Sequence, residues 1–162
     1  NLEPLLADLD SQAARLASEL RQLSHECDGA PIAVIAHSMG GLVARAALRL
    51  VDSAGISQLI TLASPHHGTR LARLLHVLPF SQMRPQSAWL EELNAVQEPH
   101  FPVPLTCIYS NSDNIVRPTE SAALKGARLI ELRGLGHLSL LSARESIDRT
   151  LATLLAPAQC PT

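Results

Sequence analysis

A block of small residues around one serine constrains the fold of this chain more than any other feature. The block Ala36–Gly41 follows an apolar run at Ile32–Ile35 and precedes an Ala- and Leu-rich segment at Leu42–Leu50. A strand, a sharp turn with a serine at its apex and then a helix is the arrangement of a nucleophile elbow. The residues two before and two after the serine nearly touch in such a turn, and only small residues such as Ala36 and Gly40 fit there.

Two polar residues that a serine nucleophile needs follow Ser38 in the order that this elbow predicts. Asp113 comes after an apolar strand predicted at Pro104–Tyr109, and His137 comes after a second strand predicted at Ala127–Leu132. Because open α/β sheets carry their sites at the carboxyl ends of parallel strands, we expect all three side chains to meet. Ser38 would attack a carbonyl, His137 would act as general base and then general acid, and Asp113 would orient the imidazole.

Simpler interpretations exist for each partner alone. Asp113 has the residue type that forms turns, and His137 could be a histidine on a surface loop. Neither interpretation explains why both residues follow strands, in this order, downstream of an elbow. Glu120 is the one serious alternative to Asp113. Asp10 and Asp28 precede the serine, Asp52 lies at the end of the helix predicted after the elbow, and Asp148 lies inside the last predicted helix.

Four blocks of sequence together resemble the small bacterial lipases of the α/β-hydrolase fold: Ala36–Val43, Thr61–Thr69, Tyr109–Val116 and Gly134–Leu141. The resemblance implies an α/β protein with three layers and a mostly parallel sheet. It implies hydrolysis of carboxylic esters of the lipid (acylglycerol) type, with no cofactor. It maps the catalytic residues onto Ser38, Asp113 and His137, the same three residues that the strand positions and their order predict. It also makes the backbone N–H of Met39 one oxyanion donor.

The chain departs from this family at its front. It opens at Asn1 without a Met and enters a helical pattern at once, with leucines and alanines at helical spacing up to Leu23. We therefore expect an N-terminally truncated fold that lacks its first strands and the upstream loop that supplies a second oxyanion donor. The strand Ile32–Ala36 would then be an unpaired edge. Loss of one donor lowers turnover by roughly 10²–10³, so the fragment alone would be a feeble or inactive enzyme.

Composition agrees with a single domain over residues 1–162, the C-terminal portion of the full fold. Apolar residues make up 46% of the chain, and no apolar run approaches the roughly 18–20 residues of a membrane span. A net charge of −2 with no basic cluster argues against nucleic acid as a partner. The expected partners are an ester substrate and, transiently, a lipid interface. The resemblance implies a secreted or envelope-associated protein.

The adjacent pair His66-His67 invites a zinc interpretation, but no further ligand cluster accompanies it, and we predict no metal site. Two roles stay open for His66 because it follows a strand predicted at Ile56–Ala63. It could line the acyl site beside the elbow, or it could hold the turn before Gly68. The chain has three cysteines, Cys27, Cys107 and Cys160, which do not form a disulfide framework. Cys107 lies within a predicted strand and is expected to be a small buried hydrophobe.

Residues 70–103 form a possible cap insert. One apolar stripe in it consists of Leu71, Leu74, Leu75 and Leu78, and a short helix at Ser87–Asn94 carries a second, with Trp89, Leu90 and Leu93. A cap that faces lipid would explain the first stripe and would make Leu74 and Leu75 substrate contacts. The alternative is that both stripes pack on the sheet. A final helix is predicted from Leu138 to Ala156.

Three functions remain open for this set of residues. The favoured one is a serine ester hydrolase of the lipase type. An acyltransferase or a lipid-linked deacylase would use the same three residues. A non-catalytic hydrolase-like module is the alternative from another class, although a decayed enzyme has no reason to keep serine, aspartate and histidine together.

Overall fold

The computed structural model describes residues 7–51, 55–74 and 78–156 of the chain. Its strands form one sheet in the order β1-β2-β3-β4, and every neighbouring pair is parallel. The strands are β1 (Ile32–His37), β2 (Ile56–Leu62), β3 (Leu105–Ser110) and β4 (Arg128–Leu132). The α-helices are α1 (Leu9–Glu26), α2 (Met39–Ala47), α3 (Ala88–Gln97) and α4 (Arg144–Leu155). Short 3-10 helices are η2 (Arg70–Leu74), η3 (Thr119–Ala122) and η4 (Ser139–Leu141).

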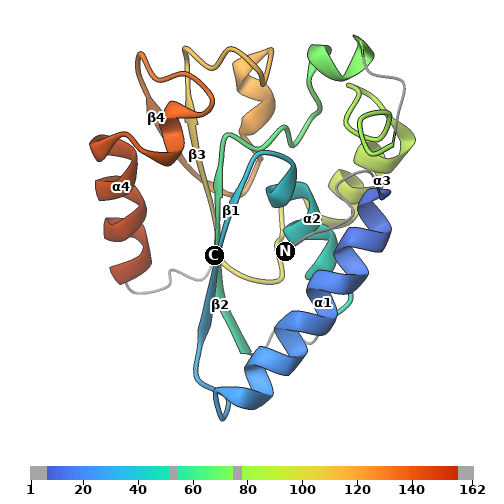
Figure 1. The fold of residues 1–162 in the computed structure, drawn as a ribbon, viewed down its shortest axis with the longest axis vertical. Helices are drawn as coiled ribbons and strands as arrows, with labels where there is room; N and C mark the ends of the chain where they lie inside the picture. The colour runs from blue at the N-terminus through green and yellow to red at the C-terminus, as the bar shows by residue number, and fades with distance from the viewer. Residues whose placement is uncertain (1–6, 52–54, 75–77, 157–162) are drawn as a thin grey trace.

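The helices cover the sheet from both sides (Figure 1). Helices α1, α2 and α3 lie on one side and α4 lies on the other. The strands follow one another in one direction across this sheet. Right-handed crossovers between them then place the connecting helices α2 and α3 on the same face. The three-layer α/β fold predicted from the sequence is confirmed, with a described sheet that is wholly parallel.

The core is centred on the two inner strands. β2 and β3 are buried along nearly their whole length, as expected for parallel strands covered on both faces. Leu59, Ile60 and Ile108 are almost fully enclosed, and Cys107 lies in the same apolar cluster as Leu59, as the small buried residue that the sequence predicted. Burial raises the pKa of the Cys107 thiol to about 11, so this cysteine stays protonated and unreactive at neutral pH.

Helix α1 begins where Asp8 caps it. The Asp8 carboxylate accepts the backbone N–H of Ser11 at 2.8 Å, which satisfies one of the free donors of the first turn. Ala13 and Ala17 then pack against the alanines of α2, and these small side chains allow the two helices to lie close together. The predicted helical pattern extended upstream to Leu5 and Leu6, which lie outside the described residues.

The second apolar stripe of the insert between β2 and β3 does not pack on the sheet, as the alternative expectation had it. The stripe on α3 contacts helices rather than the sheet: Leu90 packs with Leu9 and Leu42, and Leu93 packs with the alanines of α1 and α2. In η2, Leu74 is 72% exposed. The sequence pattern alone could not distinguish a sheet from a pair of helices as the partner of an apolar stripe.

The predicted C-terminal helix is divided into two pieces. Instead of one helix from Leu138, the chain forms η4 and then restarts at α4, after Ala143 adopts an extended conformation. The Ser146 hydroxyl donates to the carbonyl of Leu140 at 2.6 Å and so joins the two pieces. His137 lies in the loop between β4 and η4, two residues before η4 begins.

Strand β1 lies at the edge of the described sheet, where it pairs with β2 alone. Its side chain Ile35 is 48% exposed. Within the described residues this matches the predicted apolar edge. The expectation of further strands upstream stays a prediction.

Candidate active site

The turn after β1 has the strained geometry of a nucleophile elbow. Ser38 adopts φ +54° and ψ −128°, a conformation that residues other than glycine rarely populate. Its backbone N–H donates to the carbonyl of Leu62 at 2.8 Å, which attaches the turn to the end of β2. Helix α2 begins at the next residue, Met39, so the serine lies at the positive end of the helix dipole.

The tightest contact of the elbow involves Gly41 rather than Gly40. A Cβ added to Gly40 would lie 3.9 Å from the Cβ of Ala36, which is an ordinary contact. A Cβ added to Gly41 would lie 2.1 Å from Oγ of Ser64, which is impossible without movement. The predicted approach of positions 36 and 40 is found at van der Waals distance, whereas the closer approach at Gly41 was not predicted, because its partner Ser64 comes from the turn after β2.

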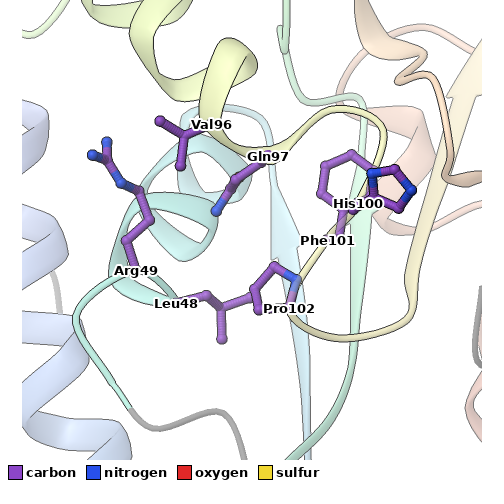
Figure 2. A pocket seen from close by; sticks show the side chains of 7 residues that line it. All are labelled: Leu48, Arg49, Val96, Gln97, His100, Phe101 and Pro102. Carbon is purple, nitrogen blue, oxygen red and sulfur yellow. The ribbon is translucent and has the colours of Figure 1, made fainter.

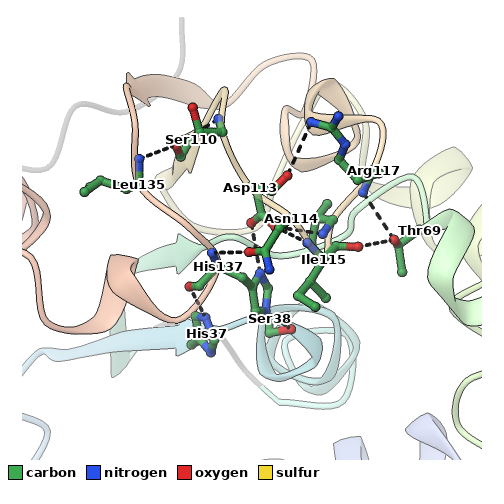
Figure 3. Close-up of polar contacts among 12 residues, drawn as sticks. His37, Ser38, Thr69, Ser110, Asp113, Asn114, Ile115, Arg117, Leu135 and His137 are labelled. Atoms are coloured by element: carbon green, nitrogen blue, oxygen red, sulfur yellow. Dashed lines mark hydrogen bonds and ion pairs between the residues drawn. The ribbon is translucent and has the colours of Figure 1, made fainter.

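The structure brings the three predicted partners together at the carboxyl ends of β1, β3 and β4 (Figure 3). Ser38 Oγ lies 2.9 Å from Nε2 of His137, and Nδ1 of His137 lies 2.9 Å from Oδ2 of Asp113. Both His137 and Asp113 are buried. The alternative acid, Glu120, lies exposed on η3. Hydrogen bonds at this spacing allow a proton to pass from the hydroxyl to the imidazole.

The two oxygens of Asp113 have separate partners. Oδ2 accepts Nδ1–H of His137, while Oδ1 accepts the backbone N–H groups of Ile115 at 2.7 Å and Val116 at 2.8 Å. Burial raises the pKa of Asp113, but these hydrogen bonds outweigh it and the net pKa is lowered. An ionised Asp113 requires the proton of neutral His137 to be on Nδ1, which leaves Nε2 free to accept the proton of Ser38.

The backbone N–H of Met39 is the predicted oxyanion donor. Met39 is the first residue of α2, and N–H groups in the first turn of a helix have no intrahelical acceptor. This donor therefore lies directly beside the serine, at the end of the helix where negative charge is stabilised.

Two residues that were not predicted from the sequence position residues 111–118, the loop between β3 and η3 that carries Asp113 and is called the acid loop here. Thr69 donates its hydroxyl to the carbonyl of Ile115 at 2.6 Å and accepts the backbone N–H of Arg117 at 3.2 Å. Arg117 in turn donates from Nη1 to the carbonyl of Asp113 at 3.4 Å. Thr69 ends one of the blocks that carry the family resemblance, and this position in the sequence could have indicated its role. No sequence feature indicated a role for Arg117.

His66 lies inside the protein rather than on an accessible surface. Its ring is fully buried, with Nε2 3.1 Å from the Thr61 hydroxyl and Nδ1 3.4 Å from Nη1 of Arg45. Arg45 also donates to Asn94 and to Gln97 on α3, each at 2.9 Å. These contacts fit the interpretation of His66 as a residue that holds the turn after β2.

The other predicted substrate contacts lie in the insert. Leu74 is exposed on η2, and Leu75 lies outside the described residues. A separate hollow lies beyond the C-terminal end of α2, whereas Ser38 precedes the N-terminal end of that helix (Figure 2). Its lining residues are Leu48, Arg49, Val96, Gln97, His100, Phe101 and Pro102. This hollow is therefore distinct from the site at Ser38.

A parallel sheet between two layers of helices, with a serine elbow after β1, defines this chain as a protein of the α/β-hydrolase fold. More particularly, residues 14–123 match the family described as the PGAP1-like alpha/beta domain, and the chain belongs to that family. The matched region contains Ser38 and Asp113 and ends before His137. Comparison with curated proteins found no match.

Solved structures of similar fold include several lipases. Bacillus licheniformis lipase BlEst2 in its mature form has a TM-score of 0.77 at 17% identity, covering 91% of this chain and 74% of that chain. Aspergillus fumigatus lipase B has a TM-score of 0.84 at 22% identity, covering 98% and 45%. Phospholipase PlaB from Legionella pneumophila has a TM-score of 0.77 at 16% identity, covering 94% and 49%. The chain thus spans less than half of two of these three proteins, and at these identities the likeness concerns the fold.

None of the helices in the described ranges combines the length and the apolar character that crossing a membrane requires.

Proposed function

We propose that this chain carries the catalytic centre of a serine carboxylic-ester hydrolase that acts on lipid esters through an acyl-enzyme on Ser38. The observation that carries the proposal is the continuous chain of hydrogen bonds from Ser38 through His137 to Asp113. A strained serine at a helix N-terminus, a neutral imidazole and an ionised carboxylate are the components that acyl transfer requires. Fold alone would not support this assignment, because one fold hosts many functions.

Each step has a residue that serves it. Ser38 Oγ attacks the ester carbonyl carbon while its proton moves to Nε2 of His137, and Asp113 stabilises the imidazolium. The negative oxygen that forms is stabilised by the N–H of Met39 and the dipole of α2. The C–O bond then breaks, and the departing alkoxide takes the proton from Nε2. A water molecule repeats the sequence on the acyl-enzyme, releases the carboxylic acid and returns the proton to Ser38.

Lipid esters are the proposed substrate class for two reasons. The proteins of similar fold include lipases and a phospholipase by name. The insert at residues 70–103 also presents the exposed Leu74 on η2. We propose that this segment acts as a cap that contacts the acyl chain and, transiently, a lipid interface. The proposed domain is the whole of residues 1–162, as part of a larger hydrolase fold.

Hydrolysis of a soluble ester such as p-nitrophenyl butyrate tests the proposal. We expect low turnover that is lost in Ser38→Ala and retained in Ser18→Ala, since Ser18 is an exposed serine on α1. Equal turnover by the two variants would refute the role of Ser38. Product analysis with an added alcohol would separate hydrolysis from acyl transfer, because a transferase would form a new ester in place of the free acid.

A further inference from the structure

All four polar groups of His137 have a partner. The ring nitrogens contact Asp113 and Ser38, as described above. The backbone N–H of His137 donates to Oδ1 of Asn114 at 3.0 Å, and its backbone carbonyl accepts Nε2–H of His37 at 3.2 Å. Figure 3 shows the contacts of Asn114 and His37 meeting at His137. One side chain therefore holds the backbone on each side of the His137 Cα.

We propose that Asn114 and His37 are positioning residues that clamp the backbone of His137 and thereby aim its Nε2 at Ser38. The inference rests on the proposed function and extends it to two residues to which the sequence analysis gave no catalytic part. We refer to the two contacts, Asn114 to the N–H and His37 to the carbonyl, as the backbone clamp.

The loop that carries His137 needs such a clamp. Glycines precede the histidine at positions 134 and 136, and Gly134 has φ +70°, so the local chain has little conformational restriction of its own. A Cβ on Gly136 would lie 3.3 Å from Oδ1 of Asn114, so the loop passes close to the side chain that holds it. The contact with Asp113 fixes the ring through one nitrogen, but it does not fix the position of the peptide from which the ring extends.

His37 suits this role because it is a donor without a second positive charge. It is half-buried beside the elbow, and its ring centroid lies 4.7 Å from that of His137. Burial lowers the pKa of His37, and the neighbouring His137 lowers it further, while the contact with the His137 carbonyl and the charge of Asp113 act in the opposite direction. A neutral His37 can donate from Nε2 and does not oppose the positive charge that forms on His137 during acyl transfer.

Removing either contact should lower turnover without weakening substrate binding. We expect Asn114→Ala and His37→Phe each to lower kcat on p-nitrophenyl butyrate by about tenfold, with KM unchanged within about twofold, because small displacements of a catalytic group cost large factors in rate. Variants that keep the required atom should recover most of the loss. Asn114→Asp retains an acceptor oxygen, and His37→Gln retains a donor at the position of Nε2.

Amide hydrogen exchange measured by NMR gives a readout that does not depend on activity. In Asn114→Ala, the amide of His137 should exchange at least about tenfold faster while the amide of Gly134 keeps its wild-type rate. Asn111→Ala is the matched control, because Asn111 lies on the same loop and accepts the N–H of Gly134 at 3.4 Å. That variant should show the reverse pattern and wild-type kcat. Normal Gly134 exchange also shows that the loop remains folded in Asn114→Ala.

Two results would overturn the clamp: wild-type His137 exchange in Asn114→Ala, or the same loss of kcat in His37→Gln and Asn114→Asp as in the variants that remove the contacts. The outcome is separable from the proposed function. If wild-type protein shows no hydrolysis that depends on Ser38, the proposed function fails, and the exchange of His137 alone then decides whether Asn114 holds its backbone.

Discussion

At the scale of single residues, Asp113 connects most parts of the site. One carboxylate oxygen sets the protonation of His137, and the other holds the amides of the acid loop. The sequence predicted this residue from its place after a strand, and the structure puts it in contact with His137. The sequence did not predict that the two carboxylate oxygens have separate partners, because the backbone amides that a loop residue contacts depend on backbone geometry.

Replacing Asp113 with asparagine should lower kcat by about 10⁴-fold, because an amide in this place no longer favours the tautomer of His137 that accepts the serine proton. Glu120→Gln should keep wild-type kcat, since Glu120 is exposed on η3. Steady-state hydrolysis of p-nitrophenyl butyrate measures both. A large loss in Glu120→Gln with a small loss in Asp113→Asn would reverse the assignment of the acid.

Buried His66 should make the protein sensitive to mild acid. Burial lowers its pKa well below the usual value, and the neighbouring Arg45 and His67 lower it further. The unfolded chain therefore takes up a proton near pH ~6.5 that the folded protein excludes, so stability is lost as the pH falls below this value. We expect Tm to fall between pH ~7.5 and ~5.5, and to fall less in His66→Gln. Parallel Tm curves for the two proteins would contradict this role of His66.

At the scale of elements, the approach of α2 to the turn after β2 determines the shape of the elbow. The strands and the helix after the serine were predicted to within a few residues, because apolar runs and small residues mark them directly. The packing of α3 on helices and the break between η4 and α4 were not predicted. Both depend on tertiary contacts, such as that between Ser146 and the carbonyl of Leu140, that a local pattern does not encode.

Alanine at Gly41 should be far more harmful than alanine at Gly40. The added Cβ at Gly41 would overlap Ser64, and forcing extra volume into a packed site costs about 1–3 kcal/mol. At Gly40 the new Cβ meets ordinary contacts, and the better helix propensity of alanine stabilises by up to about 1 kcal/mol. Urea denaturation gives both free energies of unfolding. Equal stability of the two variants would show that α2 does not approach the turn this closely.

The cap proposed at residues 70–103 is tested through Leu74 on η2. If this exposed leucine contacts acyl chains, Leu74→Ser should reduce hydrolysis of p-nitrophenyl palmitate several-fold more than that of p-nitrophenyl butyrate. Leu23→Ser on α1 is the matched control, because it changes another exposed leucine away from the insert. Equal losses on the two esters in Leu74→Ser would argue against a cap.

At the scale of the whole molecule, the sheet brings together residues that are far apart in the sequence. Ser38, Asp113 and His137 follow three different strands, and parallel pairing places their loops at one edge. The order of these residues along the chain was sufficient to predict that they would meet. The backbone clamp could not be predicted from the sequence. Asn114 and His37 follow no sequence pattern that distinguishes them from ordinary loop and strand residues.

Labelling with a fluorophosphonate tests most directly whether His137 and Asp113 activate Ser38. Intact mass and peptide mapping should show one adduct on Ser38, absent in Ser38→Ala and formed much more slowly in His137→Ala. An adduct that forms equally well in Ser38→Ala, or on Ser38 at the same rate without His137, would contradict the account.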